Sequence, residues 1–354
     1  MAKRERPITS AQARKMKTIK ATGTPPPPPA APLHTVFVQV GTGQAPAASV
    51  RVEPVSTRGR SATWRIDLDV GRPGTDLSVV LPHAERHAVT PALRKRVRGR
   101  ARPEPFRPKW AAQTFVPTLG PRIPRTRVLR RGRDVDPLFI FPPDGRFVYK
   151  DTNYPWRCVG RVISGGKIGS GVLIGPRHVL TASHVMNWSN LSVLFTANQF
   201  DNSNQGSSFA TKVWHYDKLT NINTDNVEQD YVVAVLSTPL GSTLGWLGSR
   251  EYYDDWDGEP FWSSIGYASD MGGMDRPVFQ DDVILEEEDG GDMMAMTTTN
   301  GDFVPMQSGS AVFSWWSGDP YAIGVVSSQG QGMNWISGGE AMVDLVKTAR
   351  NEDP

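Results

Sequence analysis

Short apolar runs alternate with turn residues over most of the chain from about residue 150 onward. They fall into two sets of about six, over residues 150–240 and 245–338, separated by glycine-rich or polar joins. Antiparallel strands linked by short turns produce this pattern, whereas strands that alternate with helical segments are typical of parallel sheets. The pattern therefore predicts an all-β fold of two small antiparallel β-barrels.

The last apolar pattern of the chain has a different spacing. Ala341, Leu345 and Ala349 recur every four residues, and Lys347 and Arg350 lie at the end of the same run. Apolar residues at this interval share one face of a helix, and basic residues are common in a helix's last turn. We expect a C-terminal α-helix over residues 339–350, directly after the second barrel.

The chain before residue 136 predicts three further segments. Residues 1–34 are basic and then proline-rich, with too little apolar surface to offset chain entropy, and predict a disordered tail. Residues 35–82 contain four short strand-like runs and predict a small β-rich module. Residues 83–135 are dense in arginine and proline and predict a basic linker, which leaves residues 136–354 for the main domain.

Charge is distributed unevenly between the two parts of the chain. Residues 1–133 hold 27 Lys and Arg against 7 Asp and Glu, whereas residues 134–354 hold 12 against 29, and the net charge is +3. Such asymmetry favours docking of the basic region on the acidic domain, which requires no external partner. Proteolytic processing in the linker is a second interpretation. Nucleic-acid binding ranks third, because few aromatic residues lie among the arginines.

Three motifs on the predicted strands carry side chains that can act together in nucleophilic catalysis. His184 follows an apolar hairpin that ends in Thr-Ala-Ser, Asp230 opens a buried apolar strand, and Ser308 lies in a Gln-Ser-Gly-Ser turn before another strand. A serine hydroxyl needs a neighbouring imidazole as general base, and that base needs an anion on its other nitrogen. We prefer Asp230 to Asp225, which lies in a polar loop, and Ser308 to Ser310, because a glycine follows Ser308 directly.

Together, these motifs resemble those of the trypsin-like (chymotrypsin-fold) serine proteases. The order His184, Asp230, Ser308 is that of the chymotrypsin class, and the Gln-Ser-Gly-Ser turn with a single cysteine is similar to the bacterial and fungal glutamyl-endopeptidase-like branch. The resemblance implies a serine endopeptidase with a polypeptide substrate and an oxyanion hole formed by the backbone amides of Met306 and Ser308. A glycine is usual at the position of Met306, so the alternative is a catalytically impaired, protease-like binding module.

The resemblance also assigns candidate substrate contacts. Ser327 and Gln329 belong to a segment that is similar to the strand with which such proteases pair the substrate backbone. Asp302 stands six residues before Ser308, the spacing of an acidic pocket floor that selects Arg or Lys. Val326 stands where glutamate-specific relatives carry a histidine. Gln307 replaces the aspartate that pairs with a freed N-terminal amine in trypsin-like zymogens, so that activation route is not expected.

Composition also indicates which further features the protein is not expected to have. The single cysteine, Cys158, leaves no intramolecular disulfide framework, and no apolar run has the length of a membrane span. No secretory signal peptide is recognisable at the start, which favours a cytoplasmic location, with signal-independent export as the alternative. We expect neither a metal site nor a cofactor.

Overall fold

The computed structural model describes residues 5–26, 82–120, 140–201, 203–271, 275–330 and 332–354 in full, and the backbone of six short strands elsewhere. Those six are β1 (Phe37–Val40), β2 (Ser49–Ser56), β3 (Thr63–Asp69), β4 (Leu77–Val80), β6 (Leu129–Arg130) and β7 (Arg133–Asp134). β1 pairs with β4 and β2 with β3, both antiparallel. These are the four strands that the sequence predicts between residues 35 and 82. The arginines of 125–128 and the prolines of 27–29 lie outside the described residues.

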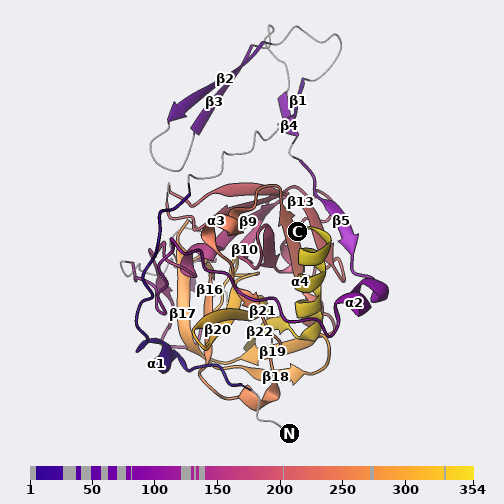
Figure 1. Ribbon diagram of the computed structural model, residues 1–354. Helices are drawn as coiled ribbons and strands as arrows, with labels where there is room; N and C mark the ends of the chain where they lie inside the picture. Colours follow the sequence, from indigo (N-terminus) through magenta and orange to yellow (C-terminus); the bar gives the residue numbers. More distant parts are fainter. Residues whose placement is uncertain are drawn as a thin grey trace.

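Six antiparallel strands form the first barrel, drawn in magenta and pink in Figure 1. Its strand order is β12-β9-β10-β11-β14-β13, and pairing of β12 with β13 closes it. Alternating apolar residues such as Val172, Leu180 and Val233 fill the interior. The strands are β9 (Val159–Ser164), β10 (Lys167–Leu173), β11 (His178–Thr181), β12 (Val193–Ala197), β13 (Ser207–His215) and β14 (Val232–Leu236).

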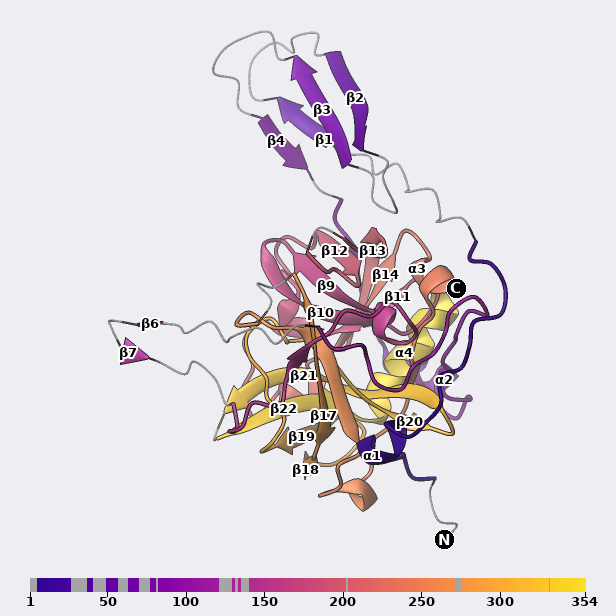
Figure 2. The ribbon, with the colours of Figure 1, turned by 90° about the vertical axis from the view of Figure 1, so that its left-hand side faces the viewer.

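A second, larger sheet lies below the first barrel and is orange to yellow in Figures 1 and 2. Its order is β18-β19-β22-β21-β20-β16-β17-β8, and β15 pairs with β21. The strands are β8 (Phe147–Val148), β15 (Gly248–Ser249), β16 (Trp262–Tyr267), β17 (Pro277–Val283), β18 (Glu286–Asp289), β19 (Met294–Thr298), β20 (Ala311–Trp316), β21 (Asp319–Gly330) and β22 (Met333–Gly338). The all-β, double-barrel prediction is confirmed.

Helices are short except at the C-terminus. α3 (Leu240–Leu244) follows the first barrel, and α4 (Glu340–Glu352) closes the chain. Ala341, Leu345 and Ala349 of α4 are fully buried, as the four-residue spacing predicts. The helix begins one residue later than expected and ends two residues later, at Glu352. Four short 3-10 helices complete the fold: η1 (Trp156–Cys158), η2 (Ser183–Val185), η3 (Val227–Gln229) and η4 (Asp254–Trp256).

Residues 5–26 differ from the predicted disordered tail. Thr9 and Gln12 form a capping box at the start of α1 (Ser10–Ala13), and Ala13 is 4% exposed. Ile8 bridges Trp315 of β20, and Figure 2 shows α1 beside β20 and β17. The composition misleads here because the basic side chains have distant acidic partners: Arg14 pairs with Asp281 at 2.6 Å and also with Asp282.

Residues 83–120 are likewise more ordered than the predicted basic linker. β5 (Glu85–Ala88) adds a parallel strand to β13, and α2 (Pro91–Val97), capped by Thr90, lies beside α4 in Figure 1. Arg94 pairs with the buried Asp344 at 3.2 Å and with Asp292 at 3.0 Å. Residues 83–120 therefore belong to the folded body of the protein. Whether opposite charge is what holds the basic region there stays a prediction.

Acidification is expected to loosen the contact between α4 and the first barrel. His178 is 0% exposed and donates from Nε2 to the Ala349 carbonyl at 3.1 Å. Burial, reinforced by Arg350, lowers the pKa of His178 to about 4 from 6.5. A histidine with a depressed pKa in the folded state stabilises the fold above pH 6.5, and that stability is lost as the pH falls through 4.

The effect is measurable by urea unfolding at pH 7, 5.5 and 4. Wild type should lose about 3 kcal/mol more unfolding free energy over this range than His178→Gln, which keeps a donor for Ala349. Equal slopes for wild type and His178→Gln would contradict the expectation.

Candidate active site

The hairpin of β10 and β11 delivers His184 to the boundary between the two sheets. β11 ends at Thr181, and the chain then turns into η2, which carries His184. Ser183 fixes this short turn, because its hydroxyl donates to the Asp217 carbonyl at 3.0 Å and accepts from the Leu219 amide at 3.1 Å. The imidazole remains partly open to solvent, at 22% side-chain exposure.

Asp230 lies behind the imidazole and is completely buried. It follows η3 and precedes β14, so the apolar strand anchors it. Its Oδ1 accepts the backbone amide of His184 at 2.9 Å, and its Oδ2 lies 2.6 Å from His184 Nδ1. Ser327 donates its hydroxyl to the same Oδ2 at 2.5 Å. These three donors fix the position of the buried carboxylate behind the imidazole.

Ser308 approaches from the second sheet, in the loop between β19 and β20. Its Oγ lies 2.8 Å from His184 Nε2. Because Nδ1 faces a carboxylate, it carries the proton in the neutral imidazole, which leaves Nε2 as an acceptor for the serine hydroxyl. The structure thus brings the three predicted side chains into one continuous hydrogen-bonded row.

The turn that carries Ser308 contains two residues with positive φ. Met306 has φ of 76° and Gly309 has φ of 82°. Only glycine fits at position 309, since a Cβ there would lie 2.2 Å from the Ser170 carbonyl oxygen. Met306 carries a side chain in a conformation that favours glycine, at a cost of about 1–2 kcal/mol. Within the described chain, neither the Met306 nor the Ser308 amide donates to a protein acceptor.

Arg146 supports this turn from behind, and nothing in the sequence analysis pointed to it. Its guanidinium donates to Gln307 Oε1 at 3.1 Å, and the same oxygen accepts the Val304 amide at 3.0 Å. Arg146 also pairs with Asp270 at 2.7 Å and Asp144 at 2.9 Å. Burial would lower the pKa of Arg146, but the hydrogen bonds that it donates to Asp144 and Asp270 outweigh burial and raise the pKa. Gln307 is therefore held by an internal cation.

Asp302 occupies a different environment from the predicted pocket floor. It is 1% exposed, and its carboxylate accepts the backbone amides of Phe141 and Gly145, each at 2.7 Å. Burial raises the pKa of this carboxyl, while the two amides act in the opposite direction. A carboxylate engaged in this way organises the loop 141–145 and is not available to select Arg or Lys. The spacing to Ser308 could not reveal these donors.

The strand β21 carries Ser327 and Gln329 along the other side of the site. Beyond Val326, the edge of β21 that faces β20 has no strand partner among the described residues. Ser327 is buried against Asp230, whereas Gln329 is exposed. Val326 is 3% exposed and belongs to the apolar core. The open edge has the geometry needed to pair with an extended peptide.

Asp225 and Ser310, the alternatives to Asp230 and Ser308, lie outside the hydrogen-bonded row. Asp225 is exposed in the loop before η3, and Ser310 is fully buried, with no hydrogen-bond partner for its hydroxyl in the described part of the chain. Cys158 is buried as well, and burial raises the pKa of its thiol. Among the described residues, no group of three or more His, Cys, Asp or Glu could hold a metal ion. No helix there has the length and apolarity to cross a membrane.

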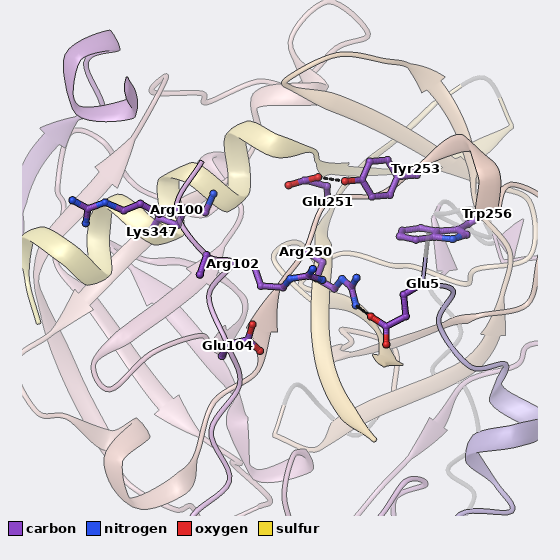
Figure 3. A pocket seen from close by; sticks show the side chains of 10 residues that line it. Glu5, Arg100, Arg102, Glu104, Arg250, Glu251, Tyr253, Trp256 and Lys347 are labelled. Carbon is purple, nitrogen blue, oxygen red and sulfur yellow. Dashed lines mark hydrogen bonds and ion pairs between the residues drawn. The ribbon is translucent and has the colours of Figure 1, made fainter. Parts of the chain in front are cut away.

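A separate hollow of about 570 Å³ lies between Glu5 of the N-terminal segment, residues 100–104 and Lys347 of α4 (Figure 3). Its charges largely compensate one another. Arg250 pairs with Glu5 at 3.4 Å and stacks on Trp316, and Lys347 pairs with Asp344 at 3.1 Å. None of its lining residues belongs to the row of His184, Asp230 and Ser308.

Comparison with known proteins bears on this geometry. A family model for a trypsin-like peptidase domain matches residues 169–323. The structure of a Glu endopeptidase in complex with MPD is similar, with 20% sequence identity and a TM-score of 0.52, over 60% of this chain and 99% of that chain. A protease, Anisep, from Arthrobacter nicotinovorans matches with 16% identity and a TM-score of 0.44, over 56% of this chain and 97% of that chain. No curated protein sequence matches the chain.

The family match and the fold lead to the same assignment. The matched residues span the hairpin that presents His184, the Asp230 strand and the Ser308 turn. The likeness to the Glu endopeptidase structure, at a TM-score of 0.52 over 99% of that chain, shows that the two share a fold. Residues 169–323 thus match the model of a trypsin-like peptidase domain, within a chain that has a chymotrypsin-like two-barrel fold.

Proposed function

We propose that this protein is a serine endopeptidase that hydrolyses peptide bonds through an acyl-enzyme on Ser308. The observation that carries the proposal is the row of hydrogen bonds from Ser308 Oγ to His184 Nε2, 2.8 Å, and from His184 Nδ1 to Asp230 Oδ2, 2.6 Å. Both distances lie within hydrogen-bond reach for nucleophile, base and orienting acid. The likeness to the Glu endopeptidase adds support at the level of the fold.

In this proposal, Ser308 Oγ attacks the substrate carbonyl carbon while its proton passes to His184 Nε2. Asp230 holds the imidazole in the correct tautomer and stabilises the imidazolium that forms. His184 then gives the proton to the departing amine, which leaves an ester on Ser308. Water, deprotonated by the same imidazole, attacks the ester and releases the acid product.

The amides of Met306 and Ser308 are the proposed oxyanion hole. Their lack of protein acceptors in the described chain leaves both donors free for a developing negative charge. A single donor of this kind typically contributes about 3–4 kcal/mol to transition-state stabilisation. Ser327 is assigned to positioning Asp230, and the backbone of β21 near Gln329 to pairing with the substrate. Asp302 has no part in this assignment.

The alternative is a catalytically impaired, protease-like binding module. The observation that favours it is the positive φ of Met306, 76°, in place of the usual glycine. Strain at this residue could be relieved by rotation of its peptide away from the cleft, which would remove one oxyanion donor. The two functions differ in whether Ser308 reacts as a nucleophile.

A fluorophosphonate probe is expected to label the wild-type protein and to leave Ser308→Ala unlabelled. Such probes phosphonylate only a serine that a neighbouring base activates. Ser310→Ala, which removes the buried neighbouring hydroxyl, is the matched control and should label like wild type. Equal labelling of wild type and Ser308→Ala would rule out the endopeptidase. If the wild type is unlabelled but Met306→Gly is labelled, the experiment would establish the binding module instead.

We further propose that opposite charge holds the basic segments of residues 5–26 and 83–104 on the acidic domain. The ion pairs of Arg14, Arg94 and Arg98 with Asp281, Asp344 and Asp292 support this arrangement. Most of these pairs are partly exposed, so each contributes modestly and weakens with salt.

A further inference from the structure

Ser170 on β10 makes an unusual set of contacts with the turn that carries Ser308. Its backbone amide donates to the Ser308 carbonyl at 2.8 Å, and its hydroxyl donates to the Met306 carbonyl, also at 2.8 Å. The hydroxyl oxygen in turn accepts the Tyr267 amide at 2.8 Å. Ser170 is 0% exposed, so water does not compete for these bonds.

The Met306 carbonyl is one end of the peptide that joins Met306 to Gln307. At the other end of this peptide, the Gln307 amide donates to the Val304 carbonyl at 3.0 Å. The peptide is thus fixed at both ends. The preceding peptide, which carries the Met306 amide, is held through its Pro305 carbonyl, which accepts the Ser269 amide at 3.1 Å, and the two anchored peptides together keep Met306 at its φ of 76°. Without the hydroxyl of Ser170, the peptide that follows Met306 would be held only through the Gln307 amide, so one of the two anchors that keep Met306 at positive φ would be weakened.

We infer that Ser170 is a positioning residue for the oxyanion hole, which compensates through its hydroxyl for the non-glycine residue at 306. The inference rests on the proposed endopeptidase function. Ser170 touches neither the substrate nor Ser308 Oγ. It acts through the peptide that follows Met306, which together with the preceding peptide fixes the conformation in which the Met306 amide points at the cleft.

The hydroxyl and the strained residue are therefore energetically coupled. With methionine at 306, the productive turn is strained by the positive φ, and one buried hydrogen bond is of the size needed to offset that strain. With glycine at 306, positive φ is free of strain. The hydroxyl should then contribute little, because the turn adopts the productive conformation without it.

The test is a double-mutant cycle that combines Ser170→Ala with Met306→Gly. For each variant, the inactivation rate constant with a fluorophosphonate probe and the probe's inhibition constant are measured separately. Phosphonylation passes through a charged intermediate that the oxyanion hole stabilises, whereas initial probe binding does not require it. Ser170→Ala is expected to lower the inactivation rate constant about tenfold with methionine at 306 and less than twofold with glycine, at an unchanged inhibition constant.

Loss of stability needs a matched control, because Ser170→Ala also leaves the Tyr267 amide without its acceptor. Ser208 on β13 is equally buried, and its hydroxyl accepts the Thr238 amide at 3.0 Å, far from the site. Ser208→Ala should therefore lower the Tm by a similar amount and leave the inactivation rate constant unchanged. Thermal unfolding of all variants confirms that each is folded at the assay temperature.

The outcomes separate the two proposals. Labelling that persists in Ser308→Ala, or is absent from wild type, overturns the endopeptidase function and the role of Ser170 with it. Labelling that depends on Ser308 but is insensitive to Ser170→Ala overturns only the positioning role. The same holds if Ser170→Ala has equal effects in both backgrounds, or if Ser208→Ala slows inactivation to the same extent.

Discussion

Replacing Asp230 with asparagine is expected to lower kcat about 10⁴-fold while the protein stays folded. The carboxylate Oδ2 now accepts from His184 Nδ1 and from the Ser327 hydroxyl, at 2.6 and 2.5 Å. An amide NH₂ in that position would donate to Nδ1 and so place the imidazole proton on Nε2. The imidazole could then no longer accept the proton of Ser308.

The measurement is steady-state hydrolysis of fluorescently labelled casein, together with the Tm of each variant. Asp225→Asn is the control, since Asp225 is exposed in the loop before η3 and makes no contact with the imidazole. Its kcat should equal that of wild type. A loss of less than tenfold in Asp230→Asn would show that Asp230 does not orient His184 during the reaction.

Arg146→Met is expected to destabilise the fold by about 3–5 kcal/mol, the usual consequence of removing one member of a buried charge cluster. Arg146 has 0% side-chain exposure, and its removal leaves Asp270, at 8%, without the cation that it pairs with at 2.7 Å. Gln307 would lose one of its two donors at the same time. We therefore expect activity to fall further than the folded fraction does.

Urea unfolding and fluorophosphonate labelling measure the two effects. The double variant Arg146→Met/Asp270→Leu should recover part of the stability, because the second substitution removes the buried carboxylate with which Arg146 pairs. Arg161→Met is the comparison, since Arg161 pairs with Asp275, which is 46% exposed, and such pairs contribute at most about 1 kcal/mol. Equal losses for Arg146→Met and Arg161→Met would contradict a supporting role for the buried cluster.

The fold and the three central residues could be predicted because their signals are local. The hairpin before His184 is two apolar runs around a Gly-Pro turn, and Asp230 and Ser308 each border an apolar strand. The four short strands between residues 35 and 82 were predicted for the same reason. Alternation and turn chemistry depend only on neighbouring residues.

The supporting residues could not be predicted, since their partners are distant in the sequence. Arg146 lies 124 residues before Asp270, and Arg14 lies 267 residues before Asp281. Basic composition alone therefore gave a disordered tail and a linker where the structure has α1, β5 and α2. Asp302 had a persuasive spacing to Ser308, but the amides of the loop 141–145 determine its role.

The contact of the N-terminal segment with β20 has a consequence for biosynthesis. Ile8 pairs with Trp315, and its carbonyl accepts the hydroxyl of Ser314, which follows 306 residues later. At roughly 5–20 residues per second, a ribosome needs on the order of 15–60 seconds to make that stretch. The nascent N-terminal segment must therefore wait for its partner strand throughout this time.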